Sequence, residues 1–144
     1  MNQDFKEFIE SLNTNDVQYL VIGGYAVAFH GVPRYTKVLD IWINPTVENA
    51  IRIISALKEF GFQSLGIQVG DLTTPAQTIQ LGYPPERIDL ITTIDGVEFS
   101  ECYQKGIKFE DSGVTINVID LENLIKNKKA SGRAQDIADL ENLI

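Results

Sequence analysis

The sequence predicts a single α/β (α+β) domain in which helices pack on a β-sheet. Over the first third of the chain, segments with apolar residues at helical spacing alternate with short apolar runs of strand length. Such alternation is typical of layered helix-and-sheet domains. At 144 residues the chain is long enough for one hydrophobic core and too short for two. Because the sequence contains no linker or low-complexity tract, we expect one domain over residues 1–144.

Regular elements are expected throughout the first half of the chain. Residues 3–13 carry apolar side chains at positions i, i+3, i+4 and i+7, which predicts an amphipathic helix: Phe5, Phe8, Ile9 and Leu12. We expect a strand at 17–22, a short helix at 25–30 and a second strand from Val38. Asn44 is then the expected N-cap of a helix that ends at Gly61. The buried stripe predicted for that helix consists of Val47, Ala50, Ile51, Ile54 and Leu57.

The second half is less regular. Residues 62–74 show no clean period, and strands are expected at 76–81 and 87–94. A short helix at 98–105 precedes an expected hairpin of 107–110 with 114–119. Two helices broken near Ser131–Gly132 end the chain. We expect the last of them to pack on the same domain through Ile137, Leu140 and Ile144.

Composition excludes several classes of protein. The net charge of −8 argues against a protein that coats nucleic acid, which needs clustered excess lysine and arginine. No apolar run approaches the roughly 20 residues of a membrane helix, and the N-terminus lacks the layout of a signal peptide. A single cysteine, Cys102, excludes an internal disulfide and is typical of a reducing compartment. We expect a cytoplasmic protein that does not bind membranes, either a monomer or a homodimer.

The pair Gly23–Gly24 lies at the expected junction of a strand and a helix. Glycine lets the backbone approach a ligand closely, and the unsatisfied N–H groups at a helix start attract anions. The pair therefore predicts a phosphate-binding turn. A turn required only by backbone geometry is the alternative.

Two carboxylates lie inside apolar strand segments, Asp40 in Val-Leu-Asp-Ile-Trp-Ile and Asp89 in Arg-Ile-Asp-Leu-Ile. A buried carboxylate is costly without a cation or a hydrogen-bond donor. If the two strands are neighbours, both side chains can converge on a divalent cation with oxygen ligands, as magnesium prefers. Alternatively, each acid lies at a strand end, solvated or paired with Arg34 or Arg87.

Cationic side chains occur in two places that suit phosphate. Arg34, with Thr36, lies in the loop before the strand of Asp40, and arginine is suited to bidentate phosphate contact. The basic cluster of this acidic chain consists of Lys126, Lys128, Lys129 and Arg133. A solvated helix face also explains that cluster. His30 is expected to be a partly buried helix residue and Cys102 a packing residue.

Taken together, these segments resemble the minimal nucleotidyltransferases of the DNA polymerase β superfamily, and most closely the group of AbiEii-type toxins and uncharacterised bacterial proteins. The likeness is carried by residues 23–31 (GGYAVAFHG), 34–36 (RYT), 39–44 (LDIWIN), 82–92 (GYPPERIDLIT) and 124–140 (LIKNKKASGRAQDIADL). It implies a small mixed sheet flanked by helices, with two Mg²⁺ ions as cofactors. It also implies transfer of a nucleoside monophosphate from a triphosphate such as ATP to an acceptor. That acceptor is a protein side chain, an RNA end or a small molecule.

The resemblance also implies roles for individual residues. Asp40 and Asp89 match catalytic acids that bind the metal. The nucleotide- and phosphate-binding residues that it implies are Gly23, Gly24, Arg34, Thr36, Lys128 and Arg133.

Val38 departs from the family pattern, which places two acids two residues apart on the strand. Residues 38 and 40 share a strand face, so this face offers one carboxylate where the family has two. Loss of one metal ligand implies a fall in transfer rate of roughly 10³-fold or more, and we expect very poor transfer. The alternative is a non-catalytic nucleotide- or partner-binding protein, such as one half of a toxin–antitoxin pair. The sequence leaves open whether Val38 is inherited or engineered.

Overall fold

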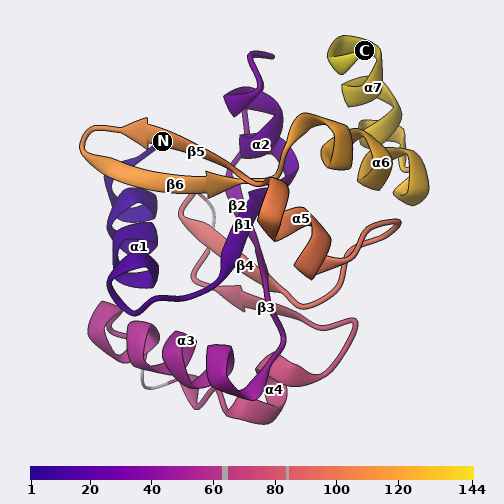
Figure 1. The fold of residues 1–144 in the computed structure, drawn as a ribbon. Helices are drawn as coiled ribbons and strands as arrows, with labels where there is room; N and C mark the ends of the chain where they lie inside the picture. The colour runs from indigo at the N-terminus through magenta and orange to yellow at the C-terminus, as the bar shows by residue number, and fades with distance from the viewer. Residues whose placement is uncertain (63–64, 84) are drawn as a thin grey trace.

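The computed structural model describes residues 1–62, 65–83 and 85–144 of the chain (Figure 1). Within these residues six strands form one sheet in the order β3-β4-β2-β1-β6-β5. The strands are β1 (Tyr19–Ile22), β2 (Val38–Ile43), β3 (Thr78–Leu81), β4 (Arg87–Ile91), β5 (Ile107–Asp111) and β6 (Val114–Val118). The β2–β4 and β1–β6 pairs are parallel, whereas β1–β2, β3–β4 and β5–β6 are antiparallel. The expected mixed sheet flanked by helices is confirmed.

Helices cover both faces of this sheet. The helices are α1 (Gln3–Thr14), α2 (Gly23–Phe29), α3 (Val47–Phe60), α4 (Val69–Thr73), α5 (Phe99–Lys105), α6 (Leu121–Ser131) and α7 (Ala134–Leu143). In Figure 1, α1 and α3 lie on one side of the sheet and α5, α6 and α7 on the other. On that second side the ring of Phe99 in α5 meets Trp42 of β2 edge to face, with ring centroids 5.1 Å apart.

The N-terminal helix forms as the spacing predicts. Its four apolar side chains at positions 5, 8, 9 and 12 are fully buried. The backbone N–H of Phe5 donates to Asn2 Oδ1 at 2.8 Å, which caps the helix start. Phe8 then packs edge to face against Phe60 of α3, with ring centroids 5.2 Å apart. The face of the sheet opposite Asp40 is thus closed by α1 and α3.

The start and the buried face of α3 differ from the prediction. Thr46, not Asn44, is the N-cap, because Thr46 Oγ1 accepts the backbone N–H of Asn49 at 3.2 Å. The Asn49 side chain accepts from the Gln18 N–H and donates to the Gln18 carbonyl, so this polar residue turns inward to the start of β1. That rotation leaves Val47 and Ile51 more than half exposed. The residues of α3 that are buried are Asn49, Ala50, Ile53, Ala56 and Leu57.

Most other expected elements are present with shifted ends. Strands β3 and β4 lie within the predicted ranges 76–81 and 87–94, and the hairpin of β5 and β6 is confirmed. The segment 62–74, which showed no period, contains the short helix α4, and its residues 63–64 lie outside the described residues. His30 is half-buried, with Nε2 2.7 Å from the carbonyl of Ile119, and Cys102 is buried.

Helix α7 packs through its acidic face, and the predicted apolar stripe is wrong. Asp136 and Asp139 are 4 % and 3 % exposed, whereas Ile137 and Ile144 are 52 % and 78 % exposed. The reason is a buried lysine, Lys128 of α6, which draws both carboxylates inward. Among the residues that the structure describes, no helix is both long and apolar enough to cross a membrane.

Candidate functional site

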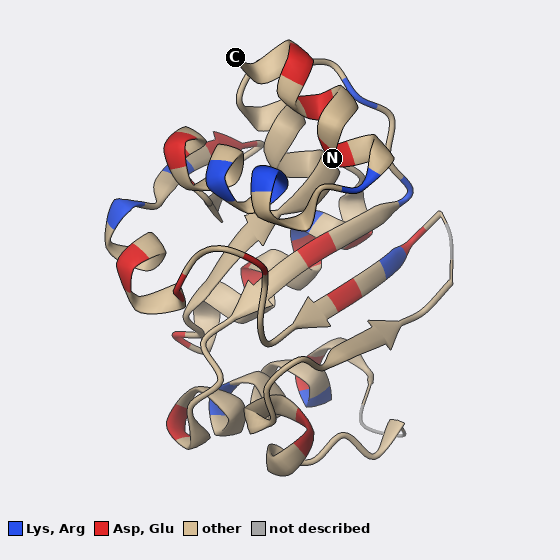
Figure 2. Cartoon of the chain, turned by 90° about the vertical axis from the view of Figure 1, so that its right-hand side faces the viewer, with Lys and Arg blue, Asp and Glu red and all other residues tan. Residues whose placement is uncertain are grey.

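The two acids predicted to share a site lie side by side on the sheet. Strands β2 and β4 run parallel, and their register places Asp40 directly opposite Asp89. Side chains of directly paired residues point to the same face. Figure 2 looks onto this side of the molecule, where acidic positions lie on two adjacent strands. The expectation that the two strands are neighbours is confirmed.

Asp40 is a partly buried carboxylate whose charge is not compensated by a direct partner. Among the described residues it accepts no hydrogen bond and forms no ion pair. Burial and the nearby charge of Asp89 raise its pKa to about 6, although Arg87, Arg133 and Arg34 act in the opposite direction. At pH 7 the group is mainly ionised, and an ionised carboxylate in such a place favours a bound cation.

Asp89 is held by an arginine of its own strand. Arg87 Nε donates to Asp89 Oδ1 at 2.9 Å and Arg87 Nη2 to Oδ2 at 2.8 Å, which makes a bidentate ion pair. Because Asp89 is only 5 % exposed, this pair compensates a nearly buried charge. Of the alternatives that the sequence left open, pairing with Arg87 holds for Asp89. It does not hold for Asp40.

Val38 lies directly opposite Arg87 in the same register. The two strands therefore present a square of side chains, Val38 beside Arg87 and Asp40 beside Asp89. Within the described ranges no group of three or more His, Cys, Asp and Glu side chains lies close enough to hold a metal ion. One free carboxylate and one already bound by arginine do not fit the two magnesium ions that the resemblance implies. They suit one divalent cation, with Asp40 as its ligand.

Gly23 begins α2 in direct contact with this carboxylate. Its φ of +67° lies in the left-handed region that favours glycine. A Cβ at this position would collide with Asp40 Oδ2. Both the backbone conformation and the close approach thus require glycine, and the helix start has no side-chain cap, as expected.

Gly23→Ala is expected to lower the free energy of unfolding more than Gly31→Ala. Both glycines have positive φ, so each substitution incurs a left-handed backbone cost of about 1 kcal/mol. A Cβ at Gly31 would meet no atom within 4 Å, whereas the methyl group at position 23 meets Asp40. We expect a difference of about 1 kcal/mol or more between the two variants. Urea denaturation measures it, and equal losses would contradict the close approach of Gly23 to Asp40.

Gly24, Arg34 and Thr36 lie together, and Gly23 lies between this group and Asp40 along the chain of contacts. A Cβ on Gly24 would collide with Arg34 Nη1 and lie 3.0 Å from Thr36 Cβ. Thr36 Oγ1 donates to the carbonyl of Val38 at 3.1 Å, which fastens this loop to the start of β2. Arg34 Nε lies 3.3 Å from Asp139 Oδ1 of α7. Gly24 and Thr36 therefore pack beside Arg34, and Arg34 pairs with α7.

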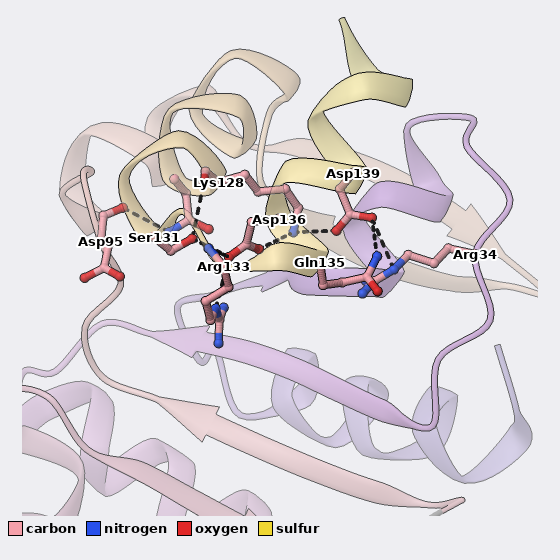
Figure 3. A network of polar contacts seen from close by, with 9 residues as sticks. Arg34, Asp95, Lys128, Ser131, Arg133, Gln135, Asp136 and Asp139 are labelled. Atoms are coloured by element: carbon pink, nitrogen blue, oxygen red, sulfur yellow. Dashed lines mark hydrogen bonds and ion pairs between the residues drawn. The ribbon is translucent and has the colours of Figure 1, made fainter.

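A buried ion-pair network joins α6 and α7 beside the acids (Figure 3). Lys128 Nζ lies 3.1 Å from Asp136 Oδ1 and 2.9 Å from Asp139 Oδ2. All three residues are at most 4 % exposed. Arg34 approaches Asp139 from the loop before β2, so the network also ties that loop to α7.

Asp136 is the most heavily bonded member of this network. Ser131 Oγ donates to Asp136 Oδ2 at 2.7 Å, and Arg133 Nε donates to the same oxygen at 3.0 Å. Burial opposes ionisation, but the hydrogen bonds from Ser131, Arg133 and Lys128 outweigh it and lower the pKa of Asp136 to about 2. The Arg133 side chain is otherwise 80 % exposed, so its remaining N–H groups are open to solvent.

A pocket of about 380 Å³ collects most of the predicted site residues, a size that suits a small-molecule ligand. The predicted residues in its lining are Gly23, Asp40, Asp89, Lys128 and Arg133. Gly24, Arg34 and Thr36 are not among the residues that line it. With Asp95 and Asp136 the lining holds four acids and two bases, which makes the pocket acidic.

A second hollow of about 510 Å³ adjoins this pocket. Thr93 and Ile94 line both of them. Trp42 and Phe99 lie in the lining of the second hollow, on the face of β2 that also carries Asp40. The ligand-sized space on this face therefore extends along β2 beyond the acids.

Asp139 was not predicted as a site residue, and Arg87 was predicted only as an alternative partner of the acids. A signal for Asp139 exists, since Asp136 and Asp139 are three residues apart on a helix and therefore share a face. Their pairing with Lys128 depends on the angle between two helices, which spacing does not give. The bond from Arg87 to Asp89 follows from a strand face that both residues share.

No protein-family model matches the chain, and neither does any curated protein. Solved structures do. A candidate nucleotidyltransferase from Thermotoga maritima matches with a TM-score of 0.63 and 17 % identity, over 96 % of this chain and 88 % of that one. The chain has a nucleotidyltransferase-like fold. An antigenic nucleotidyltransferase-like protein from Paracoccidioides brasiliensis matches with a TM-score of 0.56 and 14 % identity, over 96 % of this chain and 72 % of that one.

At these identities the similarity shows the fold and nothing finer. The nucleotidyltransferase-like fold agrees with the first part of the resemblance seen in the sequence. Membership of the AbiEii-type group stays a prediction, and so do the roles of the individual site residues.

Proposed function

We propose that the chain binds a nucleoside triphosphate in the pocket beside Gly23 and transfers its nucleoside monophosphate to an acceptor only very slowly. The observation that carries the proposal is one arrangement. A left-handed glycine at a helix start contacts Asp40, and Asp40 lies opposite Asp89 in a pocket of about 380 Å³. In a nucleotidyltransferase-like fold, this arrangement supplies both space for phosphate and carboxylates for a cation.

Arg133 is the residue we assign to the phosphates. It lines the pocket, is largely exposed, and uses its Nε on Asp136 while its other N–H groups stay open. Lys128 also lines the pocket, but its ammonium group lies between Asp136 and Asp139. We therefore assign Lys128 a positioning role, in which it holds the acid that orients Arg133.

Asp40 is the residue that we assign to magnesium. A triphosphate alone is repelled by a pocket that holds four acids and two bases, so we expect it to bind with a divalent cation. Asp40 would hold that ion, with Asp89 as a second ligand if Arg87 releases it. When bound, the ion neutralises phosphate charge and stabilises the leaving pyrophosphate.

Slow transfer follows from the same residues. Val38 removes one carboxylate from the face of β2, and Arg87 engages the carboxylate on β4. A non-catalytic nucleotide-binding protein is the second candidate, and the ion pair between Arg87 and Asp89 is the observation that favours it. Both candidates require nucleotide binding.

Titration calorimetry with ATP, GTP, CTP and UTP, each with and without Mg²⁺, tests this requirement. We expect weak binding that depends on Mg²⁺ and that Asp40→Asn weakens by about tenfold or more, because the ion loses its free carboxylate. Asp16→Asn is the control: it removes the same charge from an exposed turn with positive φ, which asparagine tolerates. A folded protein that binds none of the four nucleotides would remove the proposal and favour a partner-binding protein.

A further inference from the structure

The cation closest to the acid pair belongs to the protein itself. Both oxygens of Asp89 accept hydrogen bonds from Arg87, at 2.9 Å and 2.8 Å. Asp40 is the register partner of Asp89 on β2, so it lies beside this ion pair. The positive charge of Arg87 thus offsets the negative charges of two acids that a metal ion would otherwise neutralise.

The residue opposite Arg87 matches this arrangement. Val38 is its register partner on β2, and valine offers no oxygen to the guanidinium. A carboxylate at position 38 would lie directly beside Arg87 and share its N–H donors with Asp89. With valine there, Arg87 has Asp89 as its ion-pair partner among the described residues. Valine at position 38 and arginine at position 87 therefore act together, because the valine leaves Arg87 to pair with Asp89.

We propose that Arg87 is a built-in counter-ion that replaces a metal ion at Asp89 and limits the site to a single, weakly bound divalent cation at Asp40. A second positive charge beside the guanidinium would be repelled, and the Asp89 oxygens are already engaged. The inference deepens the proposed function and rests on it in one respect, the assignment of Asp40 as a cation ligand. It adds a residue that determines metal affinity.

With Arg87 in place, an acid at position 38 is not enough to restore a metal site. In Val38→Asp, the new carboxylate lies across from Arg87 and shares the five N–H donors of that guanidinium with Asp89, so this substitution alone adds no free ligand. Removal of the arginine is needed to release Asp89. The double variant Val38→Asp/Arg87→Gln presents three free carboxylates on one face, and carboxylate oxygens are the ligands that divalent cations such as Mg²⁺ and Mn²⁺ prefer.

The affinity of each variant for a divalent cation is measured by titration with Mn²⁺, in which the electron paramagnetic resonance signal reports the free ion. The measurement needs neither nucleotide nor turnover. Arg87→Gln is expected to raise Mn²⁺ affinity by at least about tenfold. Val38→Asp alone is expected to change it by less than about threefold, and the double variant to exceed the product of the two single effects. Arg133→Gln is the matched control, because Arg133 also acts on Asp40 without touching Asp89.

Three results would overturn the inference. The first is an Mn²⁺ affinity of Arg87→Gln no higher than that of Arg133→Gln. The second is an Mn²⁺ affinity of Val38→Asp equal to that of the double variant, and the third is no Mn²⁺ binding by any variant. Since Arg87→Gln leaves a buried acid unpaired, Arg87→Lys is the second variant. It keeps the charge but not the bidentate contact, and an affinity between those of the wild type and Arg87→Gln is expected. Nucleotide binding by the wild type, measured separately, distinguishes failure of this inference from failure of the proposed function.

Discussion

Lys128→Met is expected to lower the free energy of unfolding by about 3–5 kcal/mol, because it removes the buried cation that two buried carboxylates share and leaves each of them with one arginine contact. Asp136 and Asp139 are both within 3.1 Å of the ammonium nitrogen and almost fully buried. Methionine fills a similar volume, so the loss reports the charge and not a cavity. Urea denaturation at pH 7 measures the effect.

Lys126→Met is the matched control on the same helix. The Lys126 side chain is 56 % exposed and pairs with Glu122 at 3.6 Å, so we expect a change within about 0.5 kcal/mol. A triple variant with Lys128→Met, Asp136→Asn and Asp139→Asn should recover part of the loss, because it removes the uncompensated charges as well. If Lys128→Met were as mild as the control, the network of Figure 3 would not hold α7 in place.

The double variant Val38→Asp/Arg87→Gln is expected to release pyrophosphate from a labelled triphosphate roughly 10³-fold faster than the wild type. The estimate is a lower bound that counts only the carboxylate regained at position 38, as several kcal/mol of transition-state stabilisation at about 1.4 kcal/mol per tenfold in rate, and leaves out the release of Asp89. The assay uses Mg²⁺ with RNA, protein or small-molecule hydroxyl acceptors, and Asp40→Asn in the double variant is the inactive control. A rate equal to that of the wild type would show that the square of residues 38, 40, 87 and 89 is not a metal motif.

Much of the fold could be predicted because its signals are local. The stripe of α1 and the hairpin of β5 and β6 need only periodicity and turn residues, and both are confirmed. The rotation of α3 could not be predicted from apolar spacing, because a polar residue decides it: Asn49 bonds the start of β1. In α7 a buried lysine from another helix outweighs the apolar stripe. Both failures come from polar contacts between elements distant in the sequence.

The candidate site divides in the same way. Residue type and strand position were enough to single out Gly23, Asp40 and Asp89, and the structure gathers all three in one pocket. The sequence did not show that Asp89 is bound by Arg87 whereas Asp40 has no ion-pair partner among the residues that the structure describes, because that distinction depends on side-chain geometry. Arg34 is bound to Asp139, and only the packing of α7 reveals it.

Nucleotide is expected to bind where Gly23, Asp40 and Asp89 meet. Nuclear magnetic resonance of ¹⁵N-labelled protein, titrated with ATP and Mg²⁺, tests it most directly, since each backbone amide reports its own surroundings. The account predicts shifts at Gly23, Asp40, Asp89 and Arg133, with little change in the β5–β6 hairpin. Shifts confined to the neighbouring hollow around Trp42 and Phe99, or an unchanged spectrum, would contradict it.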